Sequence, residues 1–246
     1  MKITILTLFK EFFDGLNPEQ AEAVRSIHGP VLVNAGPGAG KTATLTKRAQ
    51  YMIMQGIDPA SILLTTFTNK AATEIKERIV KVVGEDGKRI TVGTFHSICN
   101  RILRVHGHKL GYTKTFTILS EDDTNKVMKK AAKQYALDEG ALKAYVSACK
   151  SKLLTPSKAM EVAKGMEKDL ANAYQVYQDT IFENQSMDFD DLLLNTVLLL
   201  ENYPDVKKAL NNKWKYISGD EVQDSSDTDA RLMELLAGET QNVFLV

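Results

Sequence analysis

A glycine-rich segment followed by lysine and threonine is the part of the sequence best suited to chemistry. It consists of Ala35, Gly36, Pro37, Gly38, Ala39, Gly40, Lys41 and Thr42. Glycines let successive backbone N–H groups curve around an anion, and a helix that starts there directs the positive end of its dipole at the same place. We expect Lys41 to reach the β- and γ-phosphates of a nucleotide and the Thr42 hydroxyl to ligate Mg²⁺. The segment matches the Walker A phosphate-loop pattern, with Ala35 in place of the usual first glycine.

The acidic pair Asp220–Glu221 is the second set of residues with suitable chemistry. Hydrolysis of a bound nucleotide needs one carboxylate near Mg²⁺ and another that orients and deprotonates the attacking water. We expect Asp220 to serve the metal and Glu221 to serve the water. The structural alternative is an acidic loop that caps a helix starting near Ser225, because acidic residues are common at helix starts.

Five short apolar runs of strand length must position these residues. They are bounded by turn residues and cover 31–33, 62–64, 90–92, 216–217 and 243–246. Helical patterns at 44–54 and 71–83 lie between the first three runs, an alternation typical of βαβ units. The sequence therefore predicts an α/β fold with a parallel sheet and helices on both of its faces.

From about Thr94 the alternation stops and a long helical region begins. Helical patterns cover residues 121–135, 141–152, 157–183 and 189–201. We expect strand character to return only at 214–219. The predicted organisation is an α/β domain formed by residues 1–95 and 187–246, interrupted by a mostly helical insertion at residues 96–186.

Composition excludes several classes of protein. The 246 residues are 43% hydrophobic and 25% charged, as in ordinary soluble globular proteins, and 31 basic residues balance 31 acidic ones. Global charge therefore gives no reason to expect attraction to nucleic acid or acidic lipid. Cys99 and Cys149 lie far apart without a CxxC motif, which indicates neither a disulfide framework nor a zinc site. The longest apolar stretch, 192–200, is too short to span a membrane, so we expect a cytoplasmic protein with no membrane partner.

Six short motifs taken together resemble, in order and approximate spacing, the UvrD/PcrA/Rep group of superfamily 1 DNA helicases. They are the phosphate loop and the segments 16–20, 66–72, 94–97, 188–192 and 220–224. The resemblance implies a RecA-like P-loop NTPase domain that carries a helical subdomain of the 1B type. It also implies a motor that uses ATP and Mg²⁺, moves 3′ to 5′ on single-stranded DNA and acts at junctions of single- and double-stranded DNA.

The resemblance also implies roles for residues outside the phosphate loop. Gln20 matches the glutamine that recognises adenine in this group, and an amide can hydrogen-bond both N6 and N7 of that base. Phe67 and Asn69 match one DNA-contacting motif, and Thr94 and His96 match another. An aromatic ring such as Phe67 can stack on an unpaired base, although on sequence alone a core position is an equally good interpretation.

The sequence departs from the group's pattern at several positions. Ala43 stands where many relatives carry an arginine, Ser218–Gly219 replace large apolar residues, and Asp229 stands where relatives often have glutamine.

The chain ends at Val246, before the motifs of a second RecA-like domain with its arginine fingers, which supply much of the hydrolysis rate. We therefore expect the N-terminal part of a longer helicase whose C-terminal half is its partner. Alone, this chain should bind nucleotide weakly, hydrolyse it slowly and not unwind DNA.

Two other functions share parts of the pattern. A P-loop kinase or other phosphotransferase would also use Lys41 and Thr42, but it predicts an arginine-rich lid. The helical insertion contains only Arg101 and Arg104, both at its start. A non-catalytic DNA-binding remnant of the helicase scaffold is the other possibility, and retention of the phosphate loop and the acidic pair argues against it.

Overall fold

The computed structural model describes residues 11–36, 38–220 and 226–246. The chain divides into two compact units that alternate along the sequence. Among the described residues, unit 1 contains 11–94, 211–220 and 237–246, and unit 2 contains 95–210 and 226–236. Each unit therefore depends on contacts between segments that are distant in sequence.

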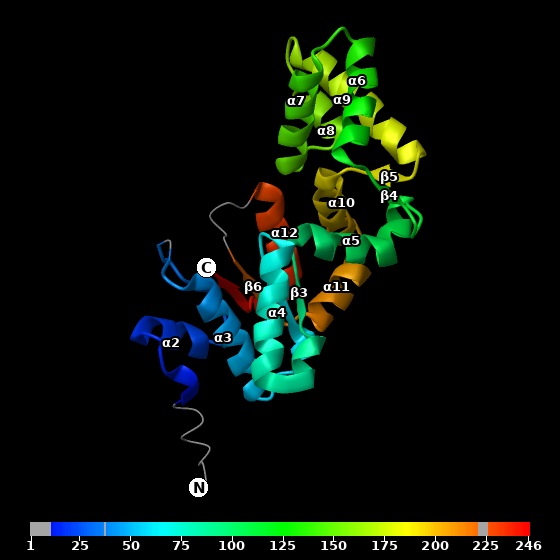
Figure 1. Cartoon of the computed structure of the whole chain (residues 1–246). Coiled ribbons are helices and arrows are strands. Elements are labelled where there is room, and N and C mark those ends of the chain that lie inside the picture. The colour runs from blue at the N-terminus through cyan, green and yellow to red at the C-terminus, as the bar shows by residue number, and fades with distance from the viewer. Residues whose placement is uncertain (1–10, 37, 221–225) are drawn as a thin grey trace. The chain divides into compact units, whose positions relative to one another are not determined.

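Unit 1 is built on a five-stranded sheet in which all neighbouring strands run parallel (Figure 1). The order across the sheet is β1–β7–β6–β2–β3. The bounds are β1 Val31–Leu32, β2 Ile62–Thr65, β3 Thr91–Gly93, β6 Tyr216–Gly219 and β7 Val243–Leu245. All five apolar runs predicted as strands contribute to this sheet, and the predicted α/β class is confirmed.

The carboxyl ends of the central strands are level with one another. Thr65, the last residue of β2, pairs with Gly93 of β3 and with Gly219 of β6. Gly219 pairs in turn with Leu245 of β7. The segments that follow β2, β3 and β6 therefore leave the sheet at one edge, the edge at which open α/β sheets bind their ligands.

Two amphipathic helices, α3 (Lys41–Met54) and α4 (Asn69–Val83), pack against this sheet and against each other (Figure 1). Their apolar residues recur three or four positions apart, which places them on one side of each helix. The core shared by helices and sheet includes Leu45, Ala49, Met52, Ile75, Ile79, Leu64 and Phe244. A shorter helix, α2 (Pro18–Arg25), packs on α3.

Unit 2 is mostly helical. Its helices are α5 (Phe95–His106), α6 (Glu121–Gln134), α7 (Glu139–Ser151), α8 (Pro156–Val162), α9 (Glu167–Glu183), α10 (Phe189–Asn202), α11 (Pro204–Lys213, whose last turn belongs to unit 1) and α12 (Asp227–Ala237). Short 3₁₀ segments in the two units cover Pro59–Ser61, Gly84–Arg89, Gly107–Leu110 and Gly238–Thr240. The helices α6 to α9 enclose a core of their own, centred on Tyr174 and Tyr177. Within the ranges that the structure covers, no helix is both long and apolar enough to cross a membrane.

Two details of unit 2 differ from the prediction. The single helix expected at 157–183 is two helices, because the chain leaves α8 at Ala163 and Gly165 adopts a left-handed conformation with φ of 56°. Strand structure also returns earlier than residue 214, because β4 (Thr117–Ile118) and β5 (Ser186–Met187) form a parallel pair. Two-residue strands are too short to show a period in the sequence.

The boundaries of the two compact units differ from those of the predicted domains. Residues 187–210 and 226–236, which we expected in the α/β domain, cluster with the helical unit. One reason is that α10 packs against α5 and α7. The functional domain boundaries near residues 95 and 187 therefore stay a prediction.

Candidate functional site

The glycine-rich loop joins the end of β1 to the start of α3. Gly38 and Gly40 have φ values of 77° and 79°, a left-handed conformation that residues with a Cβ rarely adopt. A Cβ at Gly40 would also lie 3.1 Å from the side-chain nitrogen of Gln20. Ala35, Gly36 and Ala39 lie in the same connection, and Pro37 lies outside the described residues. The loop conformation thus requires glycine at positions 38 and 40.

The start of α3 is suited to binding an anion. Gly40 is the N-cap residue, so no cap side chain covers this end of the helix. Lys41 and Thr42 form the beginning of the first turn, and both are partly exposed. The positive end of the helix dipole and the first-turn backbone therefore face the loop, as a phosphate-binding helix requires.

A hydrogen bond joins the loop to the acidic segment. The Thr42 hydroxyl donates to Oδ2 of Asp220 over 2.8 Å. Asp220 directly follows β6, and its backbone N–H donates to the carbonyl of Thr65 over 3.1 Å. Mg²⁺ takes a few protein oxygens and fills its remaining positions with water and phosphate oxygens. The paired hydroxyl and carboxylate fit such an ion, whereas Glu221, the expected base, lies outside the described residues.

Gln20 contacts the phosphate loop directly. Its side-chain nitrogen donates to the carbonyl of Ala39 over 2.9 Å, and its oxygen accepts from the backbone N–H of Asn17 over 3.0 Å. The second bond is part of a capping box with Asn17 that starts α2. A side-chain amide has two N–H donors and two lone pairs, so each end keeps capacity for one further bond. Contact with adenine stays a prediction.

Arg48 belongs to none of the motifs predicted from the sequence. It lies on the apolar side of α3, fully buried, and donates to the carbonyl of Ile27 over 2.9 Å and to the Ser218 hydroxyl over 3.3 Å. Its guanidinium carbon also lies 4.5 Å from the centre of the Phe244 ring. Burial lowers the pKa of Arg48 to about 10. The small polar Ser218, a departure from the helicase pattern, therefore supplies a partner for a buried cation that links α3 to β6.

Phe67 and Asn69 lie at the edge of the sheet where β2 ends. The Phe67 side chain is 75% exposed, so the core interpretation of this residue is wrong. Asn69 is the exposed first residue of α4, and the Thr68 side chain caps that helix by accepting from the N–H of Ala71. Thr94 directly follows β3 at the same edge. Contact of these residues with DNA stays a prediction.

His96 lies in unit 2, in the first turn of α5. Its ring centre is 5.8 Å from that of Phe189, with the two planes tilted by 59°. Phe189 is 56% exposed and begins α10. Phe189 lies inside the matched segment 188–192, for which no role of this residue was predicted. An aromatic residue directly after a helix-capping acid, Asp188, is the signal that could have identified it.

The fold and the loop define the class of protein. A parallel sheet with a glycine-rich loop after β1 and an acidic residue at the end of β6 is the arrangement of a RecA-like P-loop domain. Residues 16–246 match the UvrD/REP helicase N-terminal domain family, and the chain belongs to that family. This confirms the resemblance seen in the six motifs.

Individual relatives agree with the family match. The ATP-dependent DNA helicase PcrA of Staphylococcus aureus is 38% identical over 238 residues, which cover 94% of this chain and 33% of the relative. PcrA of Staphylococcus epidermidis shows the same identity and coverage. The chain therefore spans about a third of the length of the curated relatives it matches.

Proposed function

We propose that this chain is the part of an ATP-dependent 3′ to 5′ DNA helicase that binds Mg²⁺·ATP and single-stranded DNA. The observation that carries the proposal is the 2.8 Å contact between Thr42 and Asp220, which brings the phosphate loop and the acidic segment to one point. Membership in the helicase family supports it, as does the similarity to PcrA, an ATP-dependent DNA helicase. The rest of the helicase and a single-strand to double-strand junction are the partners that we propose for it.

Each part of the nucleotide site has a proposed role. The backbone of residues 35–42 and the start of α3 hold the phosphates, and Lys41 contacts the β- and γ-phosphates. Thr42 and Asp220 hold Mg²⁺, and Gln20 hydrogen-bonds adenine. Bound Mg²⁺·ATP supplies the phosphoryl group and the free energy of its hydrolysis. Glu221 orients a water molecule and accepts its proton on the side-chain carboxylate.

The DNA contacts are proposed for the exposed aromatic residues and their polar neighbours. Phe67 stacks on an unpaired base, and Asn69 and Thr94 contact the sugar–phosphate backbone beside it. In unit 2, His96 and the Phe189 ring next to it offer a second aromatic surface. Stacking is tolerant of base identity, so we expect binding without sequence preference.

Two substitutions test the nucleotide roles. Lys41→Ala should weaken binding of a fluorescent ATP analogue by at least about tenfold, because a charge-assisted contact to phosphate is lost. Glu221→Gln should leave that affinity unchanged and lower phosphate release by about 10²–10⁴-fold. Failure of the unsubstituted chain to bind Mg²⁺·ATP would contradict the proposal. Loss of nucleotide binding in Glu221→Gln would overturn only the role given to Glu221.

A third substitution tests the DNA surface. Phe67→Ala should weaken binding of an oligothymidine by the ~1–3 kcal/mol of one stacked base. Its urea midpoint should match that of the unsubstituted chain, because the ring is mostly exposed. Val82→Ala is the matched control, since Val82 is also exposed and lies about 20 Å along α4 from Asn69. Equal affinities of all three proteins for the oligothymidine would show that Phe67 does not contact DNA.

A further inference from the structure

Unit 2 contains a small pocket of about 230 Å³, lined by α9, α10 and the chain segments at 110–112 and 155–156. Most of its walls are apolar or aromatic. They include Leu110, Tyr112, Tyr174, Phe182, Leu194 and Leu198. Tyr112 and Leu194 are buried, whereas Phe182 is 39% exposed, so the pocket opens to solvent beside the Phe182 ring. Pockets for drug-sized molecules measure roughly 300–1,000 Å³, so this smaller one suits a single ring.

Two aromatic rings form a preformed wall of the pocket. The ring centres of Tyr112 and Phe182 are 5.0 Å apart, with the planes at 87°. Gly111 has a left-handed φ of 89°, and a Cβ there would lie 3.0 Å from the Phe182 ring, so glycine allows this close approach. The Gln185 side chain donates to the carbonyl of Gly111 over 3.2 Å and accepts from the N–H of Thr113 over 2.7 Å. The wall is therefore fixed on both sides of Tyr112, and a planar ring can pack against it.

Two buried polar atoms of the pocket residues are unpaired. Within the part of the chain that the structure describes, neither Oε1 of Gln178 nor Nδ2 of Asn195 has a hydrogen-bond partner. Burial and the Asp191 charge raise the pKa of Tyr112, whereas the amides of Asn195 and Gln178 oppose that rise, so its hydroxyl lies near both amides. Buried donors and acceptors without partners are unfavourable, so a ligand that pairs with them gains binding free energy.

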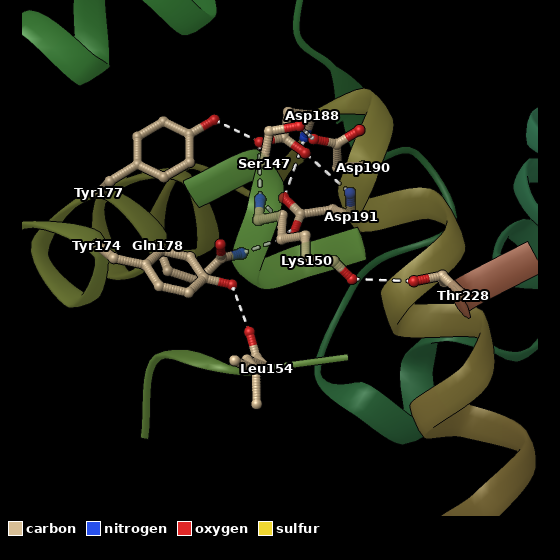
Figure 2. Close-up of polar contacts among 10 residues, drawn as sticks. All are labelled: Ser147, Lys150, Leu154, Tyr174, Tyr177, Gln178, Asp188, Asp190, Asp191 and Thr228. Atoms are coloured by element: carbon tan, nitrogen blue, oxygen red, sulfur yellow. Dashed lines mark hydrogen bonds and ion pairs between the residues drawn. The ribbon is translucent and has the colours of Figure 1, made fainter. Parts of the chain in front are cut away.

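The Gln178 amide is fixed so that its oxygen is the end left for a ligand. Its nitrogen donates to Oδ1 of Asp191 over 3.1 Å (Figure 2). Asp191 and Asp188 each have a carboxylate oxygen 2.7 Å from the ammonium nitrogen of Lys150, which is fully buried. The Tyr177 hydroxyl donates to Asp188 over 2.6 Å. Hydrogen bonds to charged groups are stronger than neutral ones, so this network holds Gln178 as an acceptor.

We propose that this pocket binds a uracil or thymine ring, either free or as a base of a nucleic acid. The imide edge of these bases has an N–H between two carbonyl oxygens. The N–H donates to Oε1 of Gln178, one carbonyl oxygen accepts from Nδ2 of Asn195, and the other accepts from the Tyr112 hydroxyl, which can turn its proton toward the ring. The proposal does not depend on the function proposed above, because it uses none of the residues assigned to the nucleotide or DNA sites.

Two methylated bases test the imide edge without any change to the protein. N1-methyluracil keeps the imide N–H, whereas N3-methyluracil carries a methyl group in its place. By saturation-transfer NMR on the 246-residue chain, N1-methyluracil should bind with a dissociation constant of about 1 mM or lower. N3-methyluracil should bind at least about tenfold more weakly, because Gln178 is left unpaired. Equal binding of the two bases, or no binding of N1-methyluracil, would overturn the proposal.

A pair of variants locates the bound ring. Asn195→Leu removes the donor at similar side-chain volume and should weaken N1-methyluracil binding by at least about fivefold. Asn202→Leu makes the same replacement further along α10, at an exposed residue that does not line the pocket, and should leave the affinity unchanged. If Asn195→Leu binds the base as the unsubstituted chain does, the ring lies elsewhere and the proposal is overturned. If Asn195→Leu does not fold, the comparison of the two bases still decides.

Competition separates the two sources of the ring. Displacement of N1-methyluracil by an oligothymidine supports a base of a nucleic acid as the occupant. Displacement by thymidine but not by the oligothymidine supports a free base or nucleoside. If neither thymidine nor the oligothymidine displaces N1-methyluracil, the pocket does not recognise these bases and the proposal is overturned.

Discussion

At the scale of single residues, two buried cations are held by different interactions: Arg48 by hydrogen bonds and Lys150 by ion pairs. Arg48 donates to carbonyl and hydroxyl groups, and burial lowers its pKa to about 10. For Lys150, burial acts in the same direction, but the charges of Asp191 and Asp188 outweigh it and raise the pKa. Arg48 therefore serves as a rigid multiple donor, whereas Lys150 is held by charge. Because the pKa values of Asp188 and Asp191, the two ion-pair partners of Lys150, are shifted, this group makes the stability of the chain depend on pH.

Asp191 gives a pH prediction. Burial and then the Asp188 carboxylate raise the pKa of Asp191 from 3.8 to about 7. Between these values the folded chain keeps a proton that the unfolded chain releases, so this group makes the folded state less stable as pH rises from about 4 to 7. Asp191→Asn cannot titrate. The unfolding free energy of the variant minus that of the unsubstituted chain should therefore increase with pH across this window, measured by urea denaturation.

The neighbouring acids define the control and the contrary result. The pKa of Asp188 is lowered, because the Lys150 charge and the hydrogen bonds of Lys150 and Tyr177 outweigh the effect of burial. Its contribution to stability is therefore lost at pH below the window used for Asp191. Asp190→Asn, at a residue bonded to Ser147 instead of Lys150, controls for the substitution itself. Parallel curves for Asp191→Asn and the unsubstituted chain would show that Asp191 does not hold its proton.

At the scale of helices and strands, the capped starts of helices position the candidate residues. Asn17 and Gln20 form a capping box beside the phosphate loop, Thr68 caps α4 beside Phe67, and Asp188 with Asp191 caps α10. In each case the capping residues lie within a motif matched to the helicase group. The same side chains therefore start an element and place a neighbouring functional residue.

Gly165 tests why the region 157–183 forms two helices. Its φ of 56° is left-handed, and among the described residues no atom beyond its two chain neighbours lies within 4 Å of the position a Cβ would take. Gly165→Ala should therefore destabilise the chain by about 1–2 kcal/mol through backbone strain alone. Gly165→Asn should cost less, because asparagine tolerates this conformation. Equal unfolding free energies for alanine and asparagine variants would contradict this explanation of the break between α8 and α9.

At the scale of the whole molecule, two compact units share a chain that passes between them repeatedly. The relatives' sequences are about three times as long, since 33% of each is covered. We infer that unwinding needs parts of a helicase that this chain does not span. Hydrolysis depends strongly on arginine fingers, which the resemblance assigns to the second RecA-like domain.

Activity measurements on the isolated chain test this inference. The 246-residue chain should release phosphate slowly and should not separate the strands of a tailed duplex. Strong turnover stimulated by single-stranded DNA would contradict it. A P-loop kinase, the alternative from another class, should bind nucleotide with an affinity that the oligonucleotide does not change.

The affinity of the chain for DNA should fall steeply as the salt concentration increases, because phosphate contacts release counterions.

Much of the fold and the phosphate loop could be predicted because the signals are local. Apolar runs, helical periodicity and glycines at left-handed positions express preferences of a few neighbouring residues, and these predicted the five strands of the sheet and the loop before α3. The two-residue strands of unit 2 could not be predicted in the same way. Nor could Arg48 and Lys150, because arginine and lysine are rarely fully buried and a sequence gives no sign of the exceptions.

The sequence by itself determined the chemistry available to this protein, namely a phosphate-binding loop, an acidic pair and the order of the helicase motifs. Only the tertiary structure decided that Thr42 meets Asp220, that Phe67 is exposed and that residues 187–210 pack with the helical unit. Strand order, burial and ion pairing depend on contacts between segments far apart in the chain. The free energy of those contacts is not expressed in the pattern of any one segment.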